Sequence, residues 1–172
     1  MTILHPVIEA LTTHGVDAAA GVETLYIYGG SIEGNGHSTG LATNANVRFA
    51  GSRQLIIDGT YMEVVAGGAN LHRQIIISGS LGSVLRGVIA GALGGAPRGS
   101  IEIINSDGTR IENAVIDSLT IDSNSDRTVL SGVSYGHSGG TITDNGTRTV
   151  KEFLNNASNE ALQVGGSGKD AS

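Results

Sequence analysis

Two segments of this chain, which begin twenty residues apart, have nearly the same sequence. Residues 53–64 read RQLIIDGTYMEV, and residues 73–84 read RQIIISGSLGSV. Each segment has an Arg-Gln pair, a run of β-branched or Leu residues, a polar residue and a glycine. A unit that recurs at about 20 to 50 residues is typical of a stacked architecture, in which each unit covers the hydrophobic face of its neighbour. The recurrence therefore favours a solenoid.

Other apolar runs extend this pattern along the chain. They begin at residues 25, 55, 75, 101, 114 and 129, at steps of 30, 20, 26, 13 and 15 residues. Each run then meets Gly, Asn, Asp or Ser, which predicts a strand followed by a corner. Unbroken runs such as Ile75–Ile77 suit parallel strands, because both faces of such strands are covered. We therefore expect an all-β solenoid of parallel strands; a β-sandwich, with alternating polar and apolar residues and some buried aromatic side chains, is the alternative.

The clean step between the two segments predicts which side chains stack. Four pairs are expected on adjacent parallel strands: Arg53 with Arg73, Gln54 with Gln74 as an amide ladder, Ile57 with Ile77, and Gly59 with Gly79. Stacked arginines repel each other, so an acid is expected beside them, either Asp58 or Glu63. The glycines recur because a corner often needs a positive φ.

The composition excludes several kinds of site and partner. The chain has 172 residues, enough for one domain with a core, and no cysteine, so neither a disulfide nor a Cys-based metal site is possible. Asp and Glu number 16 against 10 Lys and Arg, which disfavours a nucleic-acid partner. The most apolar window, residues 84–99, is interrupted by Arg86, so we expect no membrane insertion. No cofactor is expected.

The ends of the chain are less regular than its middle. Residues 1–24 are expected to form a lead-in, with a short helix possible over residues 6–15, PVIEALTTHG. Residues 25–154 are expected to form the solenoid. Residues 155–172 are polar and rich in Gly and Ser, which predicts a flexible tail. The whole is expected to be a piece of a longer protein.

The segment YGGSIEGNG, residues 28–36, is similar to the glycine-rich phrase of the first coils in polygalacturonase-type and pectate-lyase-type right-handed parallel β-helices. The same phrase occurs in phage tailspikes and tail-fibre proteins built on that fold. The direct match covers about nine residues, and the strand pattern extends it loosely over residues 25–150. The resemblance implies a right-handed parallel β-helix and, as in the tailspikes, a homotrimer.

The resemblance also implies a chemistry that can be compared with the sequence. Polygalacturonases carry Asn-Thr-Asp, Asp-Asp, Gly-His-Gly and Arg-Ile-Lys motifs, and such hydrolases need two carboxylates flanking the bond. This chain has no Asn-Thr-Asp, Asp-Asp or Arg-Ile-Lys, and only Gly136-His137-Ser138 approaches the third motif. The remaining candidates for a catalytic pair are Glu33 and Asp58, which could face one groove from neighbouring coils or across a subunit boundary.

A pectate lyase would instead require a calcium cluster and a base. Asp117, Asp122 and Asp126 lie close together in the sequence and could contribute such ligands. Asp is equally common at the corners of any β-solenoid, and we favour this structural interpretation. No metal site is therefore predicted.

Two further motifs have a structural and a chemical interpretation. His137 lies near Ser134 and Ser138, but the chain has no Gly-x-Ser-x-Gly elbow, so a solvated loop is expected rather than a nucleophilic site. Residues 91–99, GALGGAPRG, lack the Lys-Ser/Thr ending of a phosphate-binding loop and are expected to form a close-packed turn.

These observations favour a structural and receptor-binding segment of a phage tailspike or tail fibre, located in the virion and engaging bacterial surface polysaccharide. A polysaccharide lyase or hydrolase of the β-helix group, or an extracellular adhesin, is the alternative. The missing motifs make catalysis by this segment the less favoured interpretation. The homotrimer interface is expected after about residue 101, where the shorter steps would suit chains that share one core.

Overall fold

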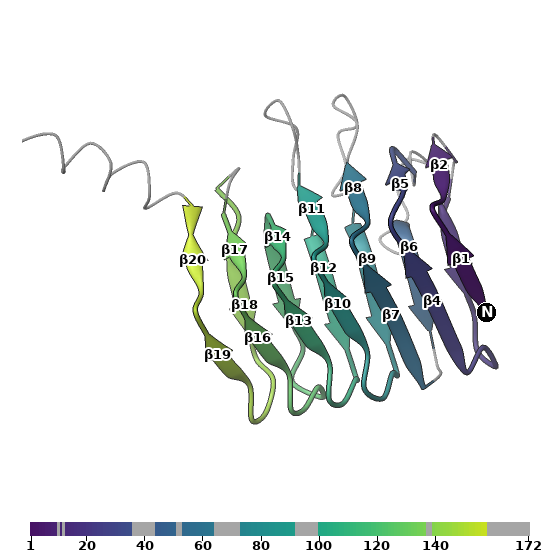
Figure 1. Cartoon of the computed structure of the whole chain (residues 1–172). Coiled ribbons are helices and arrows are strands. Elements are labelled where there is room, and N and C mark those ends of the chain that lie inside the picture. Colours follow the sequence, from purple (N-terminus) through teal and green to yellow (C-terminus); the bar gives the residue numbers. More distant parts are fainter. Residues whose placement is uncertain are drawn as a thin grey trace, which may run out of the picture.

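The strands of this chain pair in parallel and form three sheets, which are the sides of a series of stacked coils (Figure 1). The structure is a computed structural model and describes residues 1–9, 11, 13–35, 44–50, 53–63, 73–91, 100–136 and 139–157. The chain runs through one strand of each sheet in turn and then begins the next coil. This is a parallel β-helix, which confirms the all-β prediction and excludes the sandwich.

Each sheet takes one strand from each coil that contributes to it. Sheet A consists of β1 (Thr2–Leu4), β4 (Thr24–Tyr28), β7 (Gln54–Asp58), β10 (Val84–Arg86), β13 (Arg110–Glu112), β16 (Val129–Ser131) and β19 (Val150–Glu152). Sheet B consists of β2 (Val7–Glu9), β5 (Ser31–Glu33), β8 (Tyr61–Glu63), β11 (Ile89–Gly91), β14 (Val115–Ile116), β17 (Ser134–Tyr135) and β20 (Asn155–Asn156). Sheet C consists of β3 (Val16–Ala18), β6 (Ala45–Ala50), β9 (Arg73–Ser78), β12 (Ser100–Ile104), β15 (Ser118–Ile121) and β18 (Ile142–Asp144).

The core is made of side chains that occupy the same position in successive coils. In sheet A this inward column contains Ile27, Ile57, Leu85, Ile111 and Leu130, all fully buried and paired in register. In sheet C it contains Phe49, Ile77, Ile103 and Ile121, which are also fully buried. Each such side chain stabilises the fold by about 1.5–3 kcal/mol relative to an exposed one. Stacking of like with like therefore builds one continuous core.

The predicted stacking of Ile57 on Ile77 is wrong. Ile57 lies on β7 of sheet A, where it pairs with Ile27 and Leu85, whereas Ile77 lies on β9 of sheet C. The two similar segments are thus two sides of one coil. They resemble each other because each is a buried strand followed by a corner, and both corners take a glycine with positive φ, at Gly59 and Gly79.

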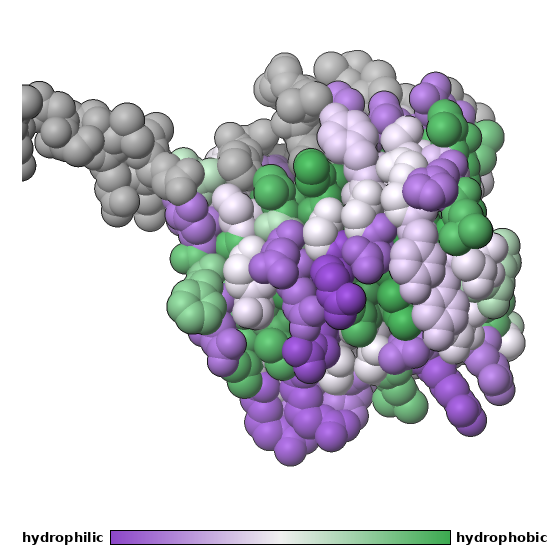
Figure 2. All heavy atoms as spheres, viewed as in Figure 1, coloured by the Kyte–Doolittle hydropathy of each residue, from purple (hydrophilic) through white to green (hydrophobic). Residues whose placement is uncertain are grey.

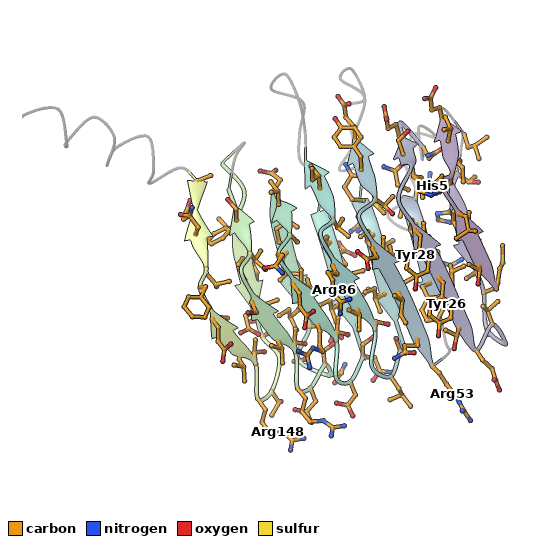
Figure 3. All side chains as sticks on the ribbon, viewed as in Figure 1. His5, Tyr26, Tyr28, Arg53, Arg86 and Arg148 are labelled. Atoms are coloured by element: carbon orange, nitrogen blue, oxygen red, sulfur yellow. The ribbon has the colours of Figure 1, made fainter. Side chains whose placement is uncertain are left out.

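The other pairs expected from that repeat are separated in the same way. The Gln54 amide donates to the Gly82 carbonyl at 2.9 Å, while Gln74 accepts from the Asn46 amide at 2.5 Å. Arg53 is exposed at a corner (Figure 3), and Arg73 forms its ion pair with Glu102 on β12 rather than with Asp58 or Glu63. An amide ladder exists, but Asn46 and Gln74 on neighbouring strands of sheet C form it.

The sequence does contain a repeat that marks successive coils, at the corner from sheet C to sheet A. Its members are SLGS, SDGT, SDRT and GTRT, which begin at residues 80, 106, 125 and 146. The Ser80 N–H donates to the Ser106 hydroxyl, and the Ser106 N–H donates to the Ser125 hydroxyl, both at 3.2 Å. These hydroxyls are buried and satisfy backbone donors of the preceding coil.

The corner from sheet A to sheet B has the same length in every coil. Each A strand ends three residues before the next B strand begins, as from Tyr28 to Ser31. The first residue of each corner has a positive φ, between 46° and 65°; these residues are His5, Gly29, Gly59, Gly87, Asn113, Gly132 and Phe153. Each amide from His5 to Gly132 donates to the last carbonyl of the following A strand, as Gly29 does to Asp58 at 2.8 Å.

The β-helix begins earlier than the sequence predicted. The expected lead-in contains β1, β2 and β3, which form the first coil, and the short helix considered for residues 6–15 is wrong where the structure describes it, because Val7–Glu9 is a strand paired with β5. At the other end the β-helix extends to β20. The remaining residues of the predicted tail, 158–172, lie outside the described part of the chain.

The coils become shorter after β12 for a local reason. In the second coil β5 ends at Glu33 and β6 begins at Ala45, whereas in a later coil only Asp117 separates β14 from β15. Ile111 and Leu130 remain fully buried in the core of this chain. In addition, the steps of 13 and 15 residues join strands of different sheets, β12 to β14 and β14 to β16, and so measure parts of coils. Together these facts remove the argument for a shared core after residue 101. The trimer itself stays a prediction.

Two glycine substitutions distinguish backbone strain from steric overlap at the corner between sheets A and B. A Cβ added at Gly59, φ 65°, meets nothing within 4 Å, so Gly59→Ala is expected to lower the free energy of unfolding by about 1–2 kcal/mol through the left-handed backbone alone. A Cβ added at Gly30, φ 74°, lies 2.2 Å from the Pro6 carbonyl oxygen. Gly30→Ala is therefore expected to cost more than about 3 kcal/mol. Denaturant unfolding measures the free energy of unfolding of both variants. Equal losses in the two variants would contradict the described geometry of the corner.

Candidate functional site

Two tyrosines lie next to each other on the outside of sheet A. Tyr26 and Tyr28 alternate along β4 with the buried Leu25 and Ile27, so both face outward. Their ring centroids are 6.3 Å apart and the ring planes differ by 3°. Figure 3 shows them next to each other on the strand. The pair exposes aromatic faces together with two phenol groups.

A third tyrosine lies across the corner, on sheet B. Tyr61 pairs in register with Ser31, and only Gly29 and Gly30 separate Ser31 from Tyr28. The Tyr61 N–H also donates to the Gly30 carbonyl at 3.1 Å. We call Tyr26, Tyr28 and Tyr61 the tyrosine face.

The phenol of Tyr61 is held in its neutral form. Burial is the largest cause, and it is joined by the hydrogen bond to Glu63 and by the negative charges of Glu63 and Glu33. Together they raise the pKa of Tyr61 to about 12. The Tyr61 hydroxyl donates to Glu63 Oε2 at 2.8 Å, which fixes the direction of its proton.

A row of carboxylates borders the tyrosine face on sheet B. Glu9, Glu33 and Glu63 are paired in register on β2, β5 and β8, with neighbouring strands about 4.8 Å apart. Like charges opposite each other on adjacent strands destabilise a sheet. Among the described residues no group of three or more His, Cys, Asp and Glu side chains could hold a metal ion.

A row of alternating charges borders the tyrosine face on sheet A. Asp58 pairs in register with Tyr28, and Arg86 and Glu112 follow on the next two strands. Arg86 lies 3.8 Å from Asp58 and 3.3 Å from Glu112. A hydrogen bond from Arg110, and then one from Arg86, lower the pKa of Glu112 against the opposing effect of burial. Figure 2 shows the pale side chains over β4 beside the purple, strongly hydrophilic ones over β10 and β13.

The structure places the two residues of the predicted catalytic pair on different sheets. Glu33 lies at the end of β5 in sheet B, within the carboxylate row. Asp58 lies at the end of β7 in sheet A, beside Arg86. Each carboxylate has its own charged neighbours within this chain, and the pairing of the two across a subunit boundary stays a prediction.

The three aspartates considered for calcium lie at corners of the coil. Asp122 accepts from the Asn105 N–H at 3.0 Å and from the Ser125 hydroxyl at 2.5 Å. Asp126 accepts from Arg148 Nε at 2.8 Å, and Asp117 is fully buried in the connection between sheets B and C. The structural interpretation of these residues accounts for their positions.

The remaining sequence motifs lie mostly outside the described part of the chain. Ser134 is the first residue of β17, while His137 and Ser138 lie outside the described residues. Residues 92–99 of the glycine-rich segment also lie outside them. No helix in the described part of the chain is long and apolar enough to cross a membrane.

The ionisation of Tyr61 provides a test of the site geometry. Because its pKa in the folded protein lies above the ordinary 10.0, the neutral phenol favours folding below that pH, and this contribution is lost as the pH rises through about 12. Glu63→Gln removes one charge and is expected to lower the pKa of Tyr61 while burial keeps it above 10.0. Ultraviolet titration measures this, with Tyr61→Phe identifying the transition. An unchanged Tyr61 transition in Glu63→Gln would contradict the contact.

No family model matches the chain, and comparisons with curated proteins and with solved structures also find no match.

Proposed function

We propose that this chain is a β-helical, receptor-binding segment of a phage tailspike or tail fibre, and that its tyrosine face binds bacterial surface polysaccharide. The observation that carries the proposal is the outward-facing pair Tyr26 and Tyr28, whose ring planes are parallel to within 3°. Tyr61 lies across the corner on sheet B, and a charged row lies on each side. Aromatic faces provide apolar contact for sugar rings, and phenols, carboxylates and guanidinium groups provide hydrogen bonds for hydroxyls.

The scaffold supports this role because it fixes the side chains of the face. Tyr26 and Tyr28 lie on a strand whose inward residues, Leu25 and Ile27, are fully buried between neighbouring coils. A site on strands of a packed core is held more rigidly than a site on loops. An elongated, regular surface also suits a ligand that is itself an extended repeating chain.

Binding rather than cleavage is proposed, because the two candidate carboxylates, Glu33 and Asp58, lie on different sheets. The protein as proposed recognises the polysaccharide and presents the virion to it. Any cleavage would then belong to another part of the appendage.

The proposal includes a parallel homotrimer. Three exposed apolar side chains at the N-terminal end and on sheet B support it: Leu4, Val7 and Ile89, with exposed fractions of 67%, 75% and 46%. Light scattering is expected to give about three times the chain mass of 17.5 kDa. A monomeric mass at all concentrations would remove the trimer and leave the binding proposal to its own test.

Binding is tested with the double variant Tyr26→Ala, Tyr28→Ala. A panel of capsular and O-antigen polysaccharides first identifies a ligand of the wild type, and calorimetry then measures its affinity. Loss of both ring faces is expected to weaken binding at least about tenfold, or about 1.4 kcal/mol. Phe153→Ala, which removes an 86% exposed aromatic side chain at the opposite end, is the matched control and should leave the affinity unchanged.

Two outcomes would overturn the proposal. One is a wild type that binds no member of the panel. The other is a double variant that is folded and binds with the affinity of the wild type, which would place the ligand away from the tyrosine face.

A further inference from the structure

The inward columns of sheets A and C change from aliphatic to charged residues in the last coil. In sheet A the column of buried aliphatic residues ends with Leu130, and the next residue in register is Lys151 on β19. In sheet C the column ends with Ile121, and the next residue in register is Asp144 on β18. Paired residues of parallel strands point to the same face, so both charged side chains occupy core positions.

The two charged residues are paired with each other across the interior. Lys151 Nζ lies 2.7 Å from Asp144 Oδ2, although the residues belong to different sheets. Asp144 also accepts from the Thr149 hydroxyl and the Gly146 N–H, both at 3.0 Å, and its side chain is 13% exposed. Lys151 is more open, at 41%. The ion pair thus lies across the end of the core and remains partly hydrated.

The N-terminal end of the β-helix has no such substitution in its inward columns. Ile3 on β1 and Ile8 on β2 pair in register with the buried Ile27 and Ile32 and pack against the core. Val16 on β3 is 8% exposed. The two ends, which lie at opposite sides of Figure 1, therefore differ in chemistry.

We propose that the coil formed by β18, β19 and β20 is a cap that prevents the N-terminal coil of a second copy from stacking on this end. Stacking would place β1 on β19, β2 on β20 and β3 on β18, and would continue all three parallel sheets. It would also remove water from Lys151 and Asp144, and the desolvation of a buried ion pair can exceed its Coulombic gain. Inward-pointing charges at sheet edges, and polar terminal repeats in solenoids, prevent association in this way.

The cap matters because head-to-tail stacking has no natural end. An interface between the N-terminal end of one chain and the C-terminal end of the next is heterologous, and such interfaces build open filaments unless a rotation closes them into a ring. The cap goes beyond the proposed binding function and does not depend on it, since none of its residues belongs to the tyrosine face.

The test restores the residues of the preceding coil. Asp144→Ile with Lys151→Leu continues the columns of Ile121 and Leu130. The double variant is expected to keep the β-sheet circular dichroism of the wild type but to show an average mass that rises at least about threefold above the wild-type value as the concentration increases. Static light scattering and electron microscopy measure this. A folded double variant with the wild-type mass at every concentration would overturn the proposal.

Two matched variants separate the cap from a general gain in hydrophobicity. Thr143→Ile with Val150→Leu adds apolar surface on the same two strands at outward positions, where Val150 is 45% exposed, and is expected to keep the wild-type mass. Ile3→Lys, added to the double variant Asp144→Ile with Lys151→Leu, places a charge at the N-terminal end of the β-helix. This triple variant is expected to have the wild-type mass again. Equal association of the outward variant, or association that persists with Ile3→Lys, would overturn the head-to-tail cap.

A less disruptive variant tests the cap if the double variant Asp144→Ile with Lys151→Leu does not fold. Asp144→Asn with Lys151→Met keeps the size of both side chains and removes both charges. It is expected to associate more weakly than the Ile/Leu pair but measurably above the wild type. A folded Asn/Met variant with the wild-type mass would also overturn the proposal.

Discussion

The hydrogen bonds that join each coil to the next fix the position of nearly every side chain in this protein. They run between parallel strands in register, so a residue in one coil lies about 4.8 Å from its equivalent in the next. Inside, this spacing stacks Ile27, Ile57 and Leu85 into one column of the core. Outside, it creates rows: opposite charges where Asp58, Arg86 and Glu112 follow one another, and like charges where Glu33 meets Glu63.

The same bonds explain which parts of the fold the sequence could predict. Strands, corners and the parallel class follow from local composition, because unbroken apolar runs and glycines at positive φ are local requirements. The register does not follow, because the two sides of one coil make the same local requirements. The segments at residues 53–64 and 73–84 look like successive coils for this reason. The motifs SDGT and SDRT, with buried hydroxyls that accept from the preceding coil, mark the register.

The candidate site, too, can be predicted from the sequence only in the parts that do not depend on the register. That Tyr26 and Tyr28 face outward can be predicted, since they alternate with Leu25 and Ile27. That Tyr61 joins them cannot be predicted without the register, because it becomes their neighbour through Ser31 on the adjacent strand. That Glu33 and Asp58 lie on different sheets cannot be predicted either, because sequence distance does not show which sheet a residue belongs to. Lys151 could have been recognised, since VKE of β19 occupies the position of VLS and RIE in earlier coils.

The connection between sheets B and C differs from the other corner in a way that concerns evolution. The corner between sheets A and B keeps one length in every coil, because its left-handed first residue and its hydrogen bond leave no room for insertion. The connection from B to C ranges from the single residue Asp117 to the whole stretch between Glu33 and Ala45. Lengthening a loop costs little entropy once its ends are held. New segments can therefore be acquired there, beside the carboxylate row, while every coil keeps its register, so this side of the molecule can vary between related proteins without any change in the core.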